Sequence, residues 1–101
     1  MIGLSEKELS LLKTIFREID PIRRAVLLGS RAMGSNRENS DVDIVLYGNE
    51  LQYADMLRAK SKIEETHMPY FFDLILGELI KSENLLKHIE RHGKEIYGEE
   101  R

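Results

Sequence analysis

Apolar positions recur with helical spacing in three stretches of the chain. The first stretch follows Ser5, which precedes Glu8 by three residues in the S-x-x-E order of a capping box. The apolar residues after it are three or four positions apart: Leu9, Leu12, Phe16 and Ile19. This spacing predicts a helix over residues 6–18, ended by Asp20 and Pro21. Two further helices are predicted by the same criterion, over residues 50–66 and 82–92.

Four other stretches have the pattern of β-strands: residues 23–28, 41–47, 69–76 and 94–97. The first is mostly apolar toward its end, as in a strand buried on both faces, and the next two alternate with period two. A short helix at 31–33 and a polar loop at 34–40 are expected between the first two strands, and Gly93 is expected just after the last helix as its C′ residue. Helices that alternate with strands predict an α/β (α+β) fold, with a small mixed β-sheet and flanking helices.

Three aspartates occupy the predicted strands. Asp41 and Asp43 are two residues apart, so both side chains point to the same face of a strand. Asp73 lies in the middle of the next, otherwise apolar strand. Carboxylates that share a face repel one another unless a cation lies between them. If the two strands are neighbours, the three carboxylates converge and predict a site for two Mg²⁺ ions, the arrangement used for phosphoryl and nucleotidyl transfer.

A Gly-Ser pair follows the first predicted strand directly. Gly29 has no Cβ, so a phosphate can approach its backbone closely, and the hydroxyl of Ser30 can donate to a phosphate oxygen. A turn into a short helix also leaves backbone N–H groups that bind anions. Arg31 adds positive charge beside the pair, and Arg37 adds more further along. We therefore predict a triphosphate at Gly29, Ser30 and Arg31, bridged by magnesium to the aspartates.

Composition narrows the class of protein. The 101 residues are expected to form a single domain, residues 1–101, of the common domain size. The absence of cysteine excludes disulfides and thiolate metal sites and suits a cytoplasmic location; neither a signal peptide nor a membrane span is expected. The net charge of −3 argues against general nucleic-acid binding. His88 and His92 are four residues apart on a predicted helix, but no third ligand accompanies them.

The chain resembles a known family at these residues. Gly29-Ser30, then Ser40-Asp41-Val42-Asp43-Ile44, then Phe72-Asp73-Leu74 are similar to the motifs of the minimal nucleotidyltransferases of the DNA polymerase β superfamily. The resemblance implies that Asp41, Asp43 and Asp73 are catalytic and bind Mg²⁺, and that ATP is the substrate. It also implies that Gly29 and Ser30 contact the nucleotide. Met33 departs from the family, which often has a second arginine there.

The resemblance further implies a partner. Many members pair with a small helical HEPN-domain protein encoded nearby, as the antitoxin of a toxin–antitoxin pair that transfers AMP to a tyrosine of the toxin. One sheet and its helices use most of a chain of this length, so few residues remain to form a pocket for the acceptor. The acceptor is therefore expected on another protein or on a second copy of this chain. Two alternatives stay open: transfer to a small-molecule acceptor, and a non-catalytic antitoxin that neutralises its partner by binding.

Overall fold

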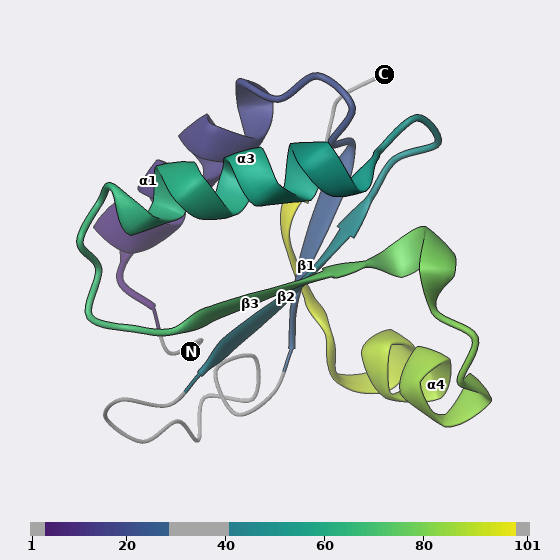
Figure 1. Cartoon of the computed structure of the whole chain (residues 1–101). Coiled ribbons are helices and arrows are strands. Elements are labelled where there is room, and N and C mark those ends of the chain that lie inside the picture. Colours follow the sequence, from purple (N-terminus) through teal and green to yellow (C-terminus); the bar gives the residue numbers. More distant parts are fainter. Residues whose placement is uncertain (1–3, 29–40, 99–101) are drawn as a thin grey trace.

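The computed structural model describes residues 4–28 and 41–98 as a sheet flanked by helices (Figure 1). The helices are α1 (Glu6–Arg17), α3 (Tyr53–Glu64) and α4 (Glu83–His92), with a short 3-10 helix η1 (Gly77–Leu79). The strands are β1 (Arg24–Leu28), β2 (Val42–Tyr47), β3 (Phe72–Leu76) and β4 (Lys94–Gly98). The helix expected at 31–33 and the loop expected at 34–40 lie outside the described residues.

The four strands form one mixed sheet in the order β3-β2-β1-β4. β1 is antiparallel to both β2 and β4, whereas β2 and β3 are parallel and are joined through α3. A parallel pair requires such a crossover because the chain must return to the same end of the sheet. The expected class, a small mixed sheet with flanking helices, is confirmed.

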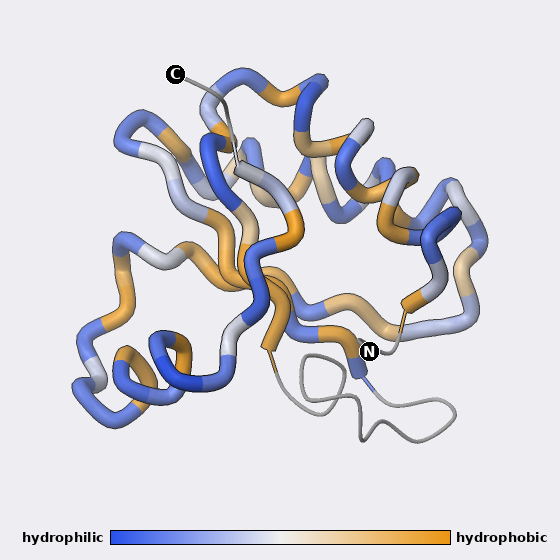
Figure 2. Tube along the Cα trace, turned by 180° about the vertical axis from the view of Figure 1, so that it is seen from behind, coloured by the Kyte–Doolittle hydropathy of each residue, from blue (hydrophilic) through white to orange (hydrophobic). Residues whose placement is uncertain are grey.

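The sheet separates two hydrophobic layers. α1 and α3 cover one face, where the larger core includes Phe16, Leu27 and Ile44 with no more than 1% of each exposed. α4 covers the other face through a smaller cluster, in which Ile89 packs with Val26, Leu28 and Val45. Figure 2 shows the hydrophobic positions concentrated along the central strands. β1 is buried on both faces as expected, because helices pack on each side of it.

Local capping decides where two of the helices begin. At α1 the predicted box is present: the Glu8 N–H donates to Ser5 Oγ (3.1 Å) and the Ser5 N–H donates to Glu8 Oε1 (2.9 Å). α3 begins at Tyr53, three residues later than predicted, because the Gln52 N–H donates to Asp55 Oδ2 (2.9 Å) and so fixes the start of the helix.

Gly93 differs from its expected role. Its φ is −71°, so it is extended and not left-handed, and any residue could adopt that backbone. Glycine is needed there for space: a Cβ at this position would lie 2.5 Å from Val26 Cγ1 and 2.6 Å from the Ile89 carbonyl oxygen. The prediction of a left-handed C′ glycine is therefore wrong, and glycine is needed at this position because the end of α4 approaches β1 closely.

Within residues 4–28 and 41–98, the helices are all too short or too polar to cross a bilayer.

Candidate active site

Two of the three predicted aspartates lie side by side on neighbouring strands. Asp43 on β2 is in register with Asp73 on β3, and Asp43 is also paired with Leu28 at the end of β1. Residues in register on adjacent strands project to the same face of a sheet. This is the face that α4 covers further along, where Val45, two residues after Asp43, belongs to the smaller core cluster. The sheet therefore brings the carboxyls of Asp43 and Asp73 to one side.

The position of these residues explains how the sheet can hold them. Asp43 and Asp73 are each the second residue of their strand, at the margin of the α4 cluster, whose member Leu28 is paired with Asp43. Asp43 is half-buried and Asp73 is exposed, so water still reaches the pair. The apolar residues that flank each aspartate in sequence point to the opposite face, into the core beneath α1 and α3. Because successive side chains point to opposite faces, each strand packs its apolar residues into the core on one face and exposes a carboxyl on the other.

Asp43 carries the electrostatic consequence of this arrangement. Its pKa is raised above the ordinary value, first because burial disfavours the charged form, then because Asp73 and Asp41 repel the charge. Asp41 lies one residue before β2 and is exposed. The shift therefore places all three carboxyls in one electrostatic neighbourhood. In the described part of the chain, no Lys or Arg side chain forms an ion pair with Asp43 or Asp73.

The carboxyls do not form a closed ligand set as they stand. Across residues 4–28 and 41–98, no group of three or more His, Asp or Glu side chains lies closely enough together to hold a metal ion. Like charges without a cation between them have no reason to approach further. The donor chemistry nonetheless fits a hard cation, because the convergent groups are carboxylates only, and Mg²⁺ binds through oxygen.

The histidine pair is a weaker candidate for a metal site: the His88 and His92 rings are 5.0 Å apart on α4, again without a third ligand among the described residues.

The predicted nucleotide-binding residues Gly29, Ser30 and Arg31 lie outside the described residues, as do Arg37 and Met33. The structure does define where that segment begins. β1 ends at Leu28, which is the residue paired with Asp43. The described part of β1 therefore ends beside Asp43.

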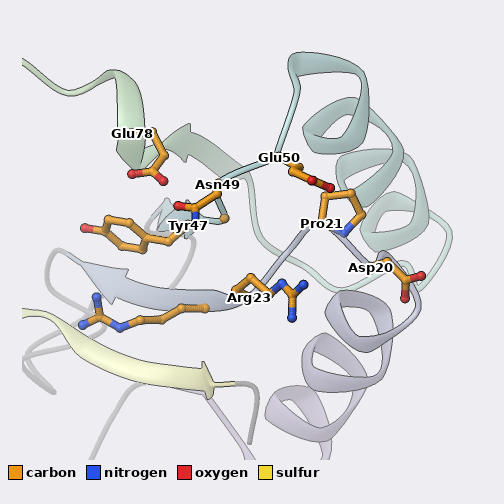
Figure 3. A pocket seen from close by; sticks show the side chains of 9 residues that line it. Asp20, Pro21, Arg23, Tyr47, Asn49, Glu50 and Glu78 are labelled. Atoms are coloured by element: carbon orange, nitrogen blue, oxygen red, sulfur yellow. The ribbon is translucent and has the colours of Figure 1, made fainter. Parts of the chain in front are cut away.

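Sequence reasoning missed a hollow at the opposite end of the sheet. It measures about 1010 Å³, and its lining includes Arg23, Arg24, Tyr47 and Glu78 (Figure 3). The Arg24 guanidinium lies 5.0 Å from the centre of the Tyr47 ring and also pairs with Glu95 on β4. These residues are at the start of β1 and the end of β2, whereas the aspartates are at the other ends. Its size alone does not make it the reaction site, because its charged groups are of mixed sign and no aspartate of the site reaches it.

The four-stranded mixed sheet with flanking helices is the fold of a nucleotidyltransferase domain. The chain belongs to the family described as polymerase beta, nucleotidyltransferase, which matches residues 11–101. A protein of Haemophilus influenzae named as a probable protein adenylyltransferase, MntA, is 28% identical over 75 residues. That match covers 73% of this chain and 66% of the relative, just under two thirds of its length.

Solved structures support the same fold. A toxin–antitoxin crystal structure with AMP-PNP superposes with a TM-score of 0.73 and 21% identity, covering 96% of this chain and 76% of that one. A complex of a tri-AMPylated Shewanella oneidensis HEPN toxin with its MNT antitoxin superposes with a TM-score of 0.70 and 16% identity, covering 95% and 74%. Identities this low establish the likeness of fold and nothing finer.

Proposed function

We propose that this protein transfers AMP from ATP to a hydroxyl, that of a tyrosine, on a HEPN-type partner protein, and that it acts thereby as an antitoxin. The observation that carries the proposal is the register of Asp43 with Asp73, with Asp41 close enough to raise the pKa of Asp43. Family membership supports the class of reaction, and the names of the similar proteins support a protein acceptor and a HEPN-type partner.

Each residue then has a role in one balanced step. The acceptor oxygen attacks the α-phosphorus of ATP, a new O–P bond forms, and the bond to the bridging oxygen of the β-phosphate breaks. Pyrophosphate leaves with the electron pair, and the hydroxyl proton passes to the Asp73 carboxylate or to water. Asp41 and Asp43 would hold Mg²⁺ with Asp73. When bound, two such ions stabilise the attacking and leaving oxygens.

The electrostatic environment of Asp43 explains why a divalent cation would bind at this site. Without a cation, Asp43 is a partly desolvated carboxyl beside two others, which raises its pKa. A divalent ion at this position removes that repulsion and favours the ionised form. Gly29, Ser30 and Arg31 are proposed to bind the phosphates, because they follow the residue paired with Asp43.

The test is label transfer. The protein is incubated with Mg²⁺ and labelled ATP, with and without the product of the neighbouring gene, and the modified residue is identified by mass spectrometry. Label is expected only with the partner, and only on a hydroxyl side chain. Asp43→Asn and Asp73→Asn keep side-chain size and are expected to reduce the rate about a hundredfold or more, since metal-bound charge stabilisation contributes several kcal/mol.

Glu90→Gln is the matched control, because it removes one exposed carboxylate on α4 away from the site. It should retain the wild-type rate. Transfer that persists in both aspartate variants would show that the proposed site does not perform the reaction. Neutralisation of the toxin that survives in variants unable to transfer label would favour an antitoxin that acts by contact alone.

A further inference from the structure

β3 has one unpaired side. It is an edge strand of the sheet, beneath α3 in Figure 1. The Val42 N–H donates to the Phe71 carbonyl oxygen (2.8 Å), which sets the alternation along the strand. Odd-numbered residues therefore bond to β2, while Phe72, Leu74 and Leu76 direct their N–H and C=O groups outward. Among residues 4–28 and 41–98, the N–H groups of these three residues have no backbone partner outside the sheet, whereas the Leu76 carbonyl is the N-cap acceptor of η1.

The two edges of the sheet are constructed differently. β4, the other edge strand, carries Lys94 and Glu95, and its pairing with β1 has a register irregularity between Ala25 and Val26. Charges and bulges of this kind prevent an edge from pairing with another chain. β3 has neither an irregular register nor a lysine, and its single charge is Asp73. The edge beside the candidate active site is thus the one left able to accept a strand.

A hollow with a mixed polar and apolar lining lies beside the start of the same edge. It measures about 420 Å³ and is lined by α3 and by the turn before β3, including Ile63, Met68 and Phe72. Phe71 also lines it, and 78% of this side chain is exposed. The hollow is on the α3 side of the sheet, whereas Asp73 points to the other face. A strand added to β3 would therefore direct alternate side chains to the hollow and to Asp73.

We propose that the acceptor hydroxyl is carried by an extended segment of the partner, which pairs with the free edge of β3 as a fifth strand. This inference rests on the function proposed above and adds the manner in which the acceptor is presented. Strands in a sheet are about 4.8 Å apart, so a side chain opposite Asp73 lies about 9.6 Å from the Asp43 position, beside the carboxylates. The residues on either side of the acceptor in this segment face the hollow and the α3 layer.

A second copy of this chain is a poorer occupant of the edge. Antiparallel pairing of two β3 strands would bring two Asp73 carboxyls to neighbouring positions of one ladder, each already beside an Asp43. Like charges in such positions are destabilising. A partner segment with a neutral hydroxyl residue adds no charge and fits the edge better.

The closing experiment measures residue-resolved amide hydrogen exchange of the full chain, alone and with the product of the neighbouring gene. Exchange of the Phe72, Leu74 and Leu76 N–H groups is expected to slow at least tenfold in the complex. The N–H groups of Asp73 and Ile75, which already donate to β2, should change far less. Unchanged exchange at the three outward amides in a formed complex overturns the proposal, as does a failure of the two chains to associate.

Two variants test the consequence for transfer. Leu76→Pro removes one outward N–H at a residue whose φ is −81°, close to the angle that proline requires, and Leu76→Val is its matched control. Loss of one hydrogen bond predicts a KM for the acceptor about three- to tenfold higher, with the Kd for Mg-ATP unchanged. Phe71→Ser should also raise KM, whereas Leu11→Ser, on α1 away from β3, should not.

The outcomes separate the two proposals. Wild-type KM in folded Leu76→Pro and Phe71→Ser proteins overturns the strand-addition proposal and leaves the transfer reaction standing. Should Leu76→Pro fail to fold, the exchange measurement on the wild type decides. No label on any partner residue refutes the proposed function instead, and slowed exchange at the outward amides without label would refute the acceptor role of the added strand.

Discussion

Asp43→Asn is expected to stabilise the protein in the absence of divalent cations. In the native state Asp43 is partly desolvated and faces Asp73 across a parallel pair of strands, so its charged form is disfavoured. Two unit charges about 5 Å apart repel by about 0.8 kcal/mol in water. Screening with a length of about 8 Å in physiological salt reduces this to about 0.5 kcal/mol. Asparagine keeps the shape of the side chain and removes the repulsion.

The effect should depend on pH in a defined direction. A raised pKa means that the folded chain binds the Asp43 proton more tightly than the unfolded chain does. Stability from this group therefore falls as pH rises from about 3.9, the ordinary value, through the raised pKa of the folded state. The variant should gain its full advantage at pH 7, and the gain should vanish near pH 3, where both states are protonated.

Thermal unfolding with chelator present measures the difference. For a domain of this size, about 0.5 kcal/mol corresponds to a rise in Tm of about 2–4 °C. Glu90→Gln controls for loss of one exposed carboxylate and should shift Tm little. With Mg²⁺ at ten times its Kd, binding of the ion raises the free energy of unfolding of the wild type by about 1.4 kcal/mol. The variant lacks this ligand and should not gain that stability, so the wild type should then be the more stable protein. A variant that is less stable than wild type at pH 7 without cation would refute the repulsion argument.

Three other substitutions have expected outcomes in the same unfolding assay. Ser5→Ala removes the α1 cap and should cost about 1 kcal/mol, with Ser5→Asp retaining it; an unchanged Tm in Ser5→Ala would contradict the role of the cap. Gly93→Ala places a Cβ 2.5 Å from Val26 Cγ1 and should cost about 1–3 kcal/mol, and a neutral result would mean that α4 can move away from β1 freely. Arg24→Ala breaks the ion pair with Glu95 on the surface, and about half of each side chain is exposed, so a loss beyond about 1 kcal/mol is not expected.

Much of the fold follows from local patterns in the sequence. The helices and strands form where spacing and capping predict them, because burial of one face and satisfaction of the first N–H groups are local requirements. Boundaries shift where strand pairing sets them: the predicted strand 69–76 begins only at Phe72, where pairing with Val42 on β2 begins. For the site, period two predicts a common face for Asp41 and Asp43, and the structure has β2 begin one residue after Asp41.

The remaining features depend on strand order, which no local pattern contains. Asp73 lies beside Asp43 because β2 and β3 are neighbours in the sheet. From the sequence, this proximity could be predicted only on the condition that the two strands are neighbours. The ion pair of Arg24 with Glu95 joins residues 71 positions apart and follows only from the β1–β4 pairing. The free edge of β3 likewise became visible only with the whole sheet. Pairings between distant segments are set by the sum of many weak contacts, so single residues carry little sign of them.

The central place of β1 has a consequence for synthesis. β1 acquires its neighbour on one side from β2 soon after it is made, but on the other side only when β4, some seventy residues later, leaves the ribosome. During that interval β1 is itself an edge of the nascent sheet, whereas in the finished sheet it lies between β2 and β4. A chaperone that protects β1 would therefore recognise a translation intermediate, and its binding site would vanish once β4 pairs with β1.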